Sequence, residues 1–313
     1  MIRWLSILAL AASLWGAEVY RVDGRVTPEG PLFIFLHSVS TPLTRKTRAF
    51  PGGRFTFKRI PAGNYTLAIY IRGRGMALRT IDVGPAVADK KRRVALALKL
   101  DPSEFVPATP RQAGYLTSVT DLSIPVKARR EYLEAQKDLA RPDADSAIKH
   151  LERAVALAPR FAAGWNNLGT IAYQQRKFRR AAECFRKALE ADPETFDALV
   201  NLGGALLALN EIDEAIGCNV QAVARRPKDA LAQSQLGVSY FAVGNFELAV
   251  KHLELARQID PGHFSSPQLA LAEIHLRRGE KRQAADVLEE YLRYHPDYPQ
   301  AAKVREEIGK LRR

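Results

Sequence analysis

The stretch FAAGWNNLGTIAYQQRKFRRAAECFRKALEADPE, residues 161–194, decides the fold of the second half of this 313-residue chain. Its apolar side chains fall at helical spacing twice, first around Trp165 and then around Phe185, with a polar break at 174–177 between them. Pro193 lacks an amide proton and restricts the residue before it, so the second helix is predicted to end there. The stretch therefore predicts a hairpin of two helices.

The same hairpin recurs along the chain. A proline returns at intervals of 34 residues and finally of 35, an alanine keeps the same period, and a small residue precedes each alanine by twelve positions. The positions are Pro159, Pro193, Pro227, Pro261 and Pro296; Ala147, Ala181, Ala215, Ala249 and Ala284; and Ala135, Gly169, Gly203, Gly237 and Ala272. The small residues let two helix backbones cross closely, where added bulk would cost roughly 1–3 kcal/mol. The fixed period predicts stacked units, with the one extra residue near 262–265.

Trp165, Leu168, Gly169 and Pro193 resemble the tetratricopeptide repeat, which shares their period and their Trp-x-x-Leu-Gly opening. The resemblance predicts five repeats and a capping helix, at 128–161, 162–195, 196–229, 230–264, 265–298 and 299–313. It also implies that the first helices line a concave groove for a peptide segment or a partner helix. The groove positions are mostly apolar and uncharged: Tyr132, Asn166, Thr170, Tyr173, Val200, Leu207, Val238, Phe241 and Leu276.

Some repeats of this family clamp a partner's terminal carboxylate with lysine, arginine and asparagine. Asn167 and Asn201 match the asparagine position, but Asp197, Leu231 and Gln235 occupy the positions of the basic residues. We therefore expect no carboxylate clamp in this chain, and we expect both asparagines to connect helices through hydrogen bonds.

Residues 18–100 show a two-residue period. Apolar side chains alternate with others in 64–72 and 92–100, which is typical of half-buried strands, and Pro- and Gly-rich turns punctuate the region. Seven strands are expected, near 18–26, 32–38, 43–49, 54–59, 64–72, 76–83 and 92–100. We expect a small β-sandwich, so the fold class is a β domain followed by a helical repeat array.

Residues 53–67, GRFTFKRIPAGNYTL, with 19–28 upstream, resemble the carboxypeptidase regulatory-like domain. The resemblance implies a transthyretin-like sandwich that has no catalytic residues of its own.

The first 17 residues have the pattern of a signal peptide. A charged start is followed by an apolar run at 4–15 and by Gly16 and Ala17, with cleavage expected near Ala17. The run is too short to span a bilayer. We expect export to the periplasm or the extracellular space; an N-terminal anchor or a buried helix is the alternative.

Residues 101–127 are rich in proline and have little apolar periodicity, so they are predicted to be a linker. Its large apolar residues, Phe105, Tyr115 and Leu122, favour partial docking on a neighbouring domain over a free linker.

Positive charge is concentrated in residues 18–127, which hold 18 Lys/Arg against 8 Asp/Glu, while the whole chain carries +13. Two clusters stand out: Arg45, Lys46 and Arg48, and Lys90, Lys91, Arg92 and Arg93. They predict a face that attracts acidic glycan or lipid headgroups in a salt-sensitive way. Solubilising charge on strand edges is the alternative. We expect no nucleic-acid partner, because the sequence has no helix-turn-helix, zinc or RNA-binding aromatic motif.

Catalytic and metal-binding motifs are missing from the sequence. The six histidines are scattered, and no metalloprotease, nucleophile-elbow, P-loop or dinucleotide motif is present. Cys184 and Cys218 occupy the same position in adjacent repeats, where helix axes about 8–10 Å apart exceed the roughly 7 Å that a disulfide tolerates. We expect free thiols, no enzymatic activity, no metal and no cofactor.

The leading hypothesis is an exported, non-enzymatic scaffold that binds a polypeptide segment in the repeat groove. The rival is envelope attachment, in which the basic sandwich binds polyanions and the repeats act as a spacer. A third interpretation fills the groove with the chain's own linker.

Overall fold

The computed structural model describes residues 18–27, 32–38, 43–71, 74–105, 123–139, 143–295 and 298–313. The chain divides into two compact units, and the division falls between Thr195 and Phe196. The described part of the N-terminal unit begins at residue 18, and the C-terminal unit ends at Arg313. The predicted signal peptide at 1–17 lies outside the described residues.

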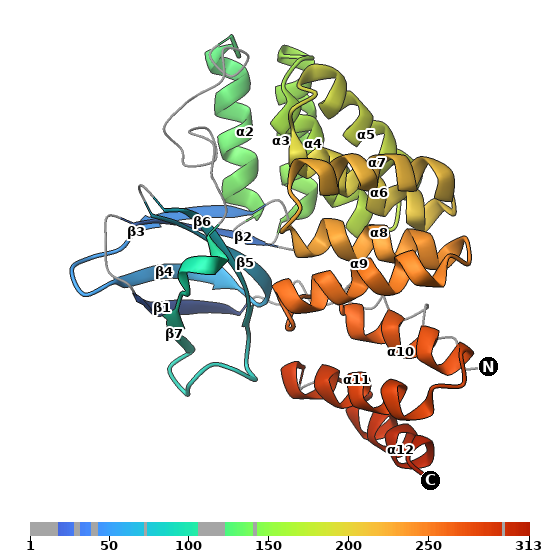
Figure 1. The fold of residues 1–313 in the computed structure, drawn as a ribbon. Coiled ribbons are helices and arrows are strands. Elements are labelled where there is room, and N and C mark those ends of the chain that lie inside the picture. Colours follow the sequence, from blue (N-terminus) through green and yellow to red (C-terminus); the bar gives the residue numbers. More distant parts are fainter. Residues whose placement is uncertain are drawn as a thin grey trace. The chain divides into compact units, whose positions relative to one another are not determined.

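The N-terminal unit begins with seven strands in two sheets (Figure 1). The strands are β1 (Val19–Thr27), β2 (Leu32–Ser38), β3 (Thr44–Arg48), β4 (Arg54–Pro61), β5 (Gly63–Ile71), β6 (Gly75–Val83) and β7 (Arg93–Lys99). One sheet has the order β4-β1-β7 and the other β3-β2-β5-β6. All neighbours are antiparallel except β1 and β7, which run parallel. The seven-stranded β-sandwich predicted from the alternation is confirmed.

The sandwich core contains the side chains that alternate toward the space between the sheets. Val22, Ile34 and Leu67 are among those with no exposed surface. At Gly24 the core needs a residue without a side chain, because a Cβ there would lie 2.1 Å from the ring of Phe55. The polar members of the same strands consequently face outward.

Eleven helices follow among the described residues. They are α2 (Val126–Leu139), α3 (Ala144–Leu157), α4 (Ala162–Gln174), α5 (Phe178–Ala191), α6 (Phe196–Leu209), α7 (Ile212–Arg225), α8 (Ala230–Ala242), α9 (Phe246–Ile259), α10 (Pro267–Arg277), α11 (Lys281–Tyr294) and α12 (Ala301–Leu311). Successive pairs from α2–α3 to α10–α11 pack as hairpins, and α12 packs on α11 through its buried Ala301, Val304 and Ile308. Five helical repeats and a capping helix are thereby confirmed. No helix of the described residues is long and apolar enough to span a membrane.

The periodic glycines lie where the two helices of a hairpin cross. A Cβ would lie 2.5 Å from the Phe185 ring at Gly169 and 2.6 Å from the Leu253 side chain at Gly237. Both contacted residues lie one turn beyond the periodic alanine of the second helix. The close crossing predicted from the small residues is therefore confirmed, with a large side chain filling the space that the glycine leaves.

Both described ends of the linker are docked. Next to the short 3-10 helix η2 (Pro102–Glu104), Phe105 packs against the sandwich core and Glu104 forms an ion pair with Arg79. At the other end, Ile124 is buried in a cluster with Phe161. Tyr115 and Leu122, which were also predicted to dock, lie outside the described residues.

Candidate functional site

In the C-terminal unit the first helices of three successive repeats are neighbours, since α6 contacts α8 and α8 contacts α10 (Figure 1). Three of the predicted groove side chains, Leu207, Val238 and Leu276, are half-buried on these helices. We call these three residues the first-helix row. They form the part of the predicted site in this unit that retains accessible apolar surface.

Two other predicted groove residues of this unit belong to its interior. Val200 is 2% exposed, because α6 is buried on most of its faces. Phe241 is 5% exposed: its ring centroid lies 5.8 Å from that of Phe246, and the Arg277 guanidinium lies 4.9 Å from the ring. Their assignment as contact residues is therefore corrected to a packing role.

In the N-terminal unit, Tyr132 and the α4 candidates make contacts within the repeats. The Asn167 side chain donates a 3.0 Å hydrogen bond to the Tyr132 hydroxyl, which ties α4 to α2 as expected for that asparagine. The Thr170 hydroxyl donates to the Asn166 carbonyl at 2.9 Å. Tyr173 remains 39% exposed and meets Phe178 edge-on. Tyr173 is thus the exposed aromatic candidate for partner contact in this unit.

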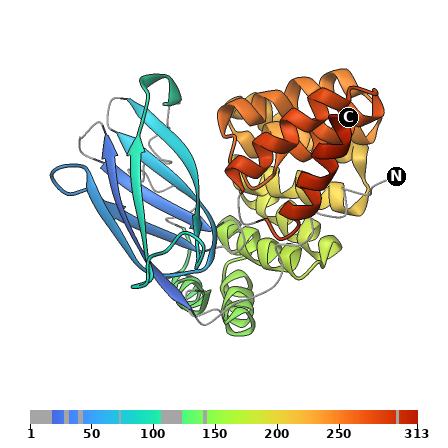
Figure 2. The same ribbon diagram turned by 90° about the horizontal axis from the view of Figure 1, so that it is seen from below.

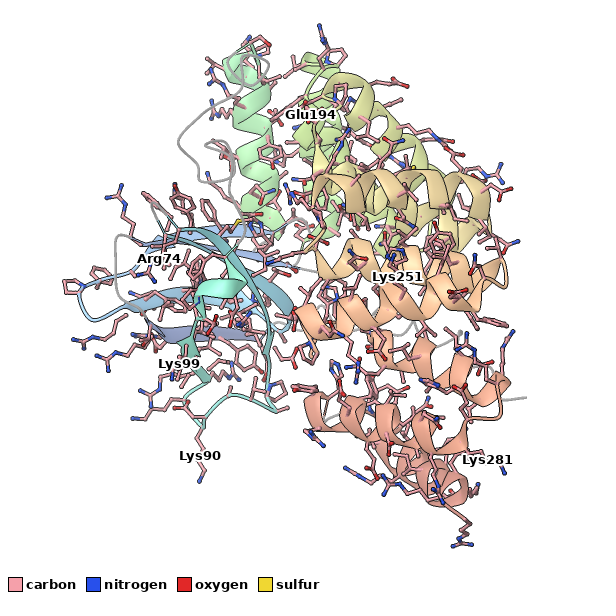
Figure 3. The ribbon with its side chains drawn as sticks, in the orientation of Figure 1. Arg74, Lys90, Lys99, Glu194, Lys251 and Lys281 are labelled. Carbon is pink, nitrogen blue, oxygen red and sulfur yellow. The ribbon has the colours of Figure 1, made fainter. Side chains whose placement is uncertain are left out.

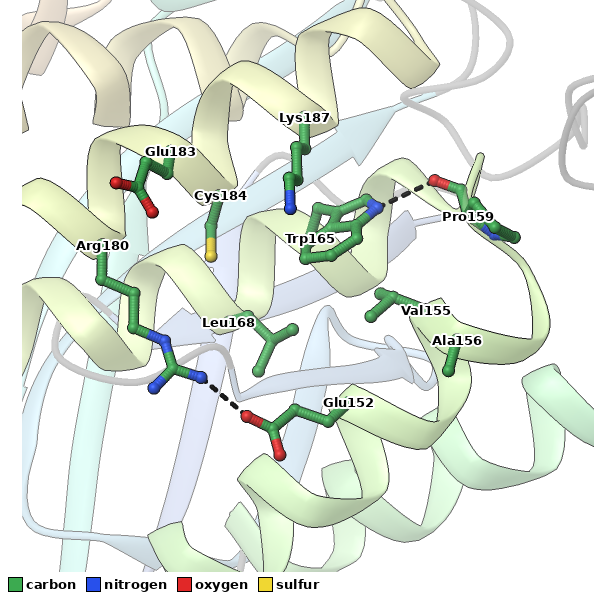
Figure 4. Close-up of a pocket in the computed structure, with 10 residues that line it drawn as sticks. All are labelled: Glu152, Val155, Ala156, Pro159, Trp165, Leu168, Arg180, Glu183, Cys184 and Lys187. Atoms are coloured by element: carbon green, nitrogen blue, oxygen red, sulfur yellow. Dashed lines mark hydrogen bonds and ion pairs between the residues drawn. The ribbon is translucent and has the colours of Figure 1, made fainter.

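A pocket of about 430 Å³ lies between α3, α4 and α5 (Figure 4). Its apolar lining includes Leu168, Val155 and Trp165, whose indole N–H donates to the Pro159 carbonyl at 2.8 Å. The Lys187 ammonium lies 4.5 Å from the Trp165 ring centroid, within the range of a cation–π contact. The volume falls in the range of about 300–1,000 Å³ usual for small-ligand pockets.

The rim of this pocket is charged and its thiol is unreactive. An ion pair of 2.7 Å joins Arg180 on α5 to Glu152 on α3 (Figure 4). Burial raises the pKa of Cys184, so its thiol stays protonated near neutral pH. Both Cys184 and Cys218 are free thiols. The sequence predicted Trp165 and Leu168 only as packing residues of the repeat. The pocket itself was not predicted, because a pocket between repeats has no sequence signature.

The first predicted basic cluster lies on β3, at an edge of the four-stranded sheet. Lys46 and Arg48 face outward and stack over Phe33 of β2, with their charged groups 4.4 and 4.9 Å from the ring centroid. Arg45 alternates to the other side, where burial lowers its pKa and the neighbouring Tyr65 opposes that shift.

The second cluster lies in the connection that enters β7 of the other sheet. Lys90 and Lys91 are exposed, Arg92 pairs with Glu18 at 3.0 Å, and Arg93 pairs with Asp89 at 2.8 Å. Hydrogen bonds from Arg93 lower the pKa of Asp89, which keeps this carboxylate charged. Because Arg93 and the outward residues of β3 belong to different sheets, the sandwich directs them to opposite outer faces. The structure does not bring the two clusters into one surface.

No group of three or more His, Cys, Asp or Glu side chains suited to a metal ion is found among the residues that the structure describes.

The helical hairpins, their glycine crossings and their proline-terminated second helices define a tetratricopeptide-repeat fold. Models of the tetratricopeptide repeat family match residues 132–177, 167–217 and 240–308. The matches lie in the helical part, and the resemblance of 18–100 to the carboxypeptidase regulatory-like domain stays a prediction.

Individual relatives share this helical part. Anaphase-promoting complex subunit 7 of Arabidopsis thaliana is 31% identical over 160 residues, which cover 50% of this chain and 28% of the relative. The peroxisomal targeting signal receptor of Kluyveromyces lactis is 33% identical over 86 residues, covering 28% of this chain and 15% of the receptor. The chain thus spans less than a third of the length of these curated relatives. The crystal structure of PilW, described as a type IV pilus biogenesis factor, is similar in fold, with a TM-score of 0.53 at 21% identity, covering 60% of this chain and 86% of PilW.

Proposed function

We propose that this protein is a non-enzymatic interaction scaffold that binds a polypeptide segment of a partner along the first helices of its repeats. The observation that carries the proposal is the first-helix row, in which Leu207, Val238 and Leu276 keep accessible apolar surface on three neighbouring helices. A segment with apolar side chains on one face gains free energy by covering such a row, at about 25 cal/mol per Å².

Support also comes from the kinds of protein that share these repeats. One relative is a subunit of a complex and another is a receptor for a targeting signal. Neither name requires a catalytic step. The same repeats in this chain are therefore proposed to supply a binding surface.

Selection from a random 12-residue peptide library on the immobilised full chain tests this proposal. We expect the selected peptides to carry apolar residues, and to lose about tenfold or more in affinity for the double variant Leu207→Asp, Leu276→Asp, because charged side chains cannot be buried under the peptide. Helix content, measured by circular dichroism, shows whether the variant is folded.

The control is Val220→Asp, which places one such charge on an exposed apolar position of the second helix α7 in the same unit. This control should bind the selected peptides as the wild type does. Equal affinity of the folded double variant for every selected peptide would contradict the proposal.

Export is a part of the proposal that rests on the pattern of residues 1–17. The mass of the chain recovered from the periplasm of a bacterial host tests it. Loss of about the first 17 residues is expected, whereas an intact chain confined to the cytoplasm would contradict export.

A further inference from the structure

The outer face of the three-stranded sheet β4-β1-β7 is strongly basic. The exposed cationic side chains of its three strands include Arg21, Arg25, Arg54, Lys58, Arg93 and Lys99. We call these six residues the basic sheet face. Figure 2 views the β domain from the side of this sheet, and Lys99 is labelled where it projects in Figure 3. The sequence clusters share only Arg93 with this set.

The strand register brings these residues together. Arg25 of β1 is directly opposite Arg54 of β4 and beside Ala97 of β7. Arg21 is beside Arg93 at one end, and Lys99 of β7 marks the other end. The six residue steps from Arg93 to Lys99 span about 20 Å at roughly 3.3 Å per residue.

Little negative charge offsets this surface. Asp23 is the carboxylate among the outward residues of the three strands, and it is occupied by Arg21 at 2.8 Å and by the Thr56 hydroxyl at 2.7 Å. Asp89, in the connection before β7, pairs with Arg93 at 2.8 Å. Arg54, Lys58 and Lys99 form no ion pair with any other residue in the described ranges.

Protection of strand edges accounts for cations on the edge strands β4 and β7, but it does not account for Arg25 on β1. Like charges directly opposite on neighbouring strands are destabilising, so Arg25 and Arg54 weaken the β1–β4 pairing. Lysine and arginine protect exposed strand edges from aggregation, but β1 is the central strand of its sheet and has no free edge. An anionic ligand bound at the centre of this face would relieve the repulsion between Arg25 and Arg54.

The same face is hollowed at its centre. A depression of about 580 Å³ is lined by Arg25 and Arg54, by Asp23, whose carboxylate is paired with Arg21, and by Gly24 and residues 95–97 of β7. The Arg25 Nε donates to the Gly52 carbonyl at 2.9 Å, which holds this side chain at the depression. Because guanidinium groups bind sulfate or carboxylate oxygens in a bidentate manner, two of them beside a hollow form a site for one anionic group.

We propose that the basic sheet face binds an acidic polysaccharide through its sulfate or carboxylate groups, with Arg25 and Arg54 at the centre of the site. A chain-like anion fits a basic stripe about 20 Å long that is hollow in the middle. A flat membrane surface does not fill a depression, and the outward residues supply no large apolar side chain for insertion. They also supply no aromatic side chain on which the bases of a single-stranded nucleic acid would stack.

Binding of the full chain to heparin and to polygalacturonate over a salt series tests the proposal. We expect binding that weakens steeply with salt, and a loss of about tenfold or more in affinity in the double variant Arg25→Glu, Arg54→Glu. The matched control is Lys46→Glu, Arg48→Glu, which reverses the same number of charges on the opposite outer face. This control should retain affinity within about twofold.

Two further probes distinguish the ligand class: vesicles containing phosphatidylglycerol, and single-stranded DNA. Stronger binding to either of these than to both polysaccharides would overturn the proposal. Equal losses in the two double variants would do the same, since they would indicate an effect of net charge rather than of this face. The outcome of the peptide selection does not affect the interpretation of polysaccharide binding, because the two experiments use different residues and different probes.

Discussion

Two turns of the C-terminal unit connect successive repeats in different ways. The turn between α7 and α8 spans residues 226–229, and the turn between α9 and α10 spans residues 260–266. In the short turn, Asp229 caps α8 by accepting a hydrogen bond from the Ala232 amide at 2.9 Å. The long turn contains the extra residue that the sequence placed near 262–265.

One hydrogen bond is the same in both turns. Gln233 donates to the Pro227 carbonyl at 2.7 Å, and Gln268 donates to the Pro261 carbonyl at 2.7 Å across the longer turn. Trp165 makes the equivalent bond to Pro159 in the N-terminal unit. A side chain of the first helix therefore donates a hydrogen bond to the proline carbonyl of the preceding repeat in the short turn and in the long turn alike.

The long turn has additional support from His263 and Ser265. His263 is 6% exposed, and its Nδ1 accepts a hydrogen bond from the Ser265 amide at 3.1 Å. Ser266, which precedes α10, adopts the left-handed conformation with φ of 50°. The short turn has neither a buried histidine nor a left-handed residue.

Removing the support of the long turn should have the largest effect. His263→Ala leaves a cavity and a Ser265 amide without its acceptor, and is expected to destabilise the C-terminal unit by about 2–4 kcal/mol. Hydrogen exchange of the α10 amides and the denaturation midpoint measure this loss. Lys228→Ala in the short turn is the control and should change stability by less than about 0.5 kcal/mol. Equal effects in the two turns would remove the distinction between them.

Acid should weaken the long turn selectively. Burial lowers the pKa of His263 to about 4; Asp260 opposes this shift and His295 adds to it. The unfolded chain, with an ordinary histidine pKa near 6.5, therefore binds the proton more readily than the folded chain. Stability should fall as pH drops from about 6.5 to about 4, by up to about 3 kcal/mol, and level off below that.

His263→Asn is the matched variant for this pH effect, because the amide oxygen can accept the Ser265 hydrogen bond but does not titrate. Chemical denaturation at pH 7, 5.5 and 4 compares the two proteins. A wild-type profile that is parallel to that of the variant would contradict the linkage to His263.

The hydrogen bond to the proline carbonyl occurs in both turns, and its removal is predicted to lower stability by a different amount in each. Gln268→Leu leaves the Pro261 carbonyl without this donor and should destabilise by about 1 kcal/mol. Gln268 also donates to Glu290, but at the longer distance of 3.3 Å, whereas the second contact of Gln233, to the His252 Nδ1, is 2.7 Å long. Gln233→Leu should therefore cost more, about 2 kcal/mol. Denaturation midpoints of the two variants measure the difference, and the reverse order would show that the long turn relies on this bond more heavily.

Periodic features of this chain were predictable from sequence, and partnerships between distant residues were not. Alternation located the strands and the 34-residue period located the helices, because both depend on local spacing. The parallel pairing of β1 with β7 leaves no trace in that spacing. The basic sheet face was missed for the same reason, since its cations alternate with buried residues on three separate strands.

The candidate groove shows a second limit of prediction from the sequence. The family pattern gives the helix face on which a residue lies, but it does not give the depth at which neighbouring side chains cover it. Leu207 and Phe241 occupy equivalent repeat positions, yet Phe241 is covered by Phe246 and Arg277 while Leu207 is half-buried. The bulk and charge of neighbours in the adjoining helices decide this, and they vary from repeat to repeat.

The smallest predicted effects have opposite signs in the two turns. Ser266→Gly should stabilise the protein by about 0.5 kcal/mol, because relief of a left-handed conformation that costs an L-residue about 1–2 kcal/mol exceeds the entropy that glycine adds to the unfolded chain. Ser266 makes no side-chain hydrogen bond that caps α10, and the hydrogen bond that its hydroxyl donates to the Phe264 carbonyl is long, at 3.3 Å, so its loss costs less than the relief of the strain gains. Asp229→Ala at the same position of the short turn should destabilise by about 1 kcal/mol, because it removes the cap of α8. Thermal denaturation followed by helical circular dichroism measures both, and a loss of stability in Ser266→Gly would mean that the serine side chain supports the long turn in its own right.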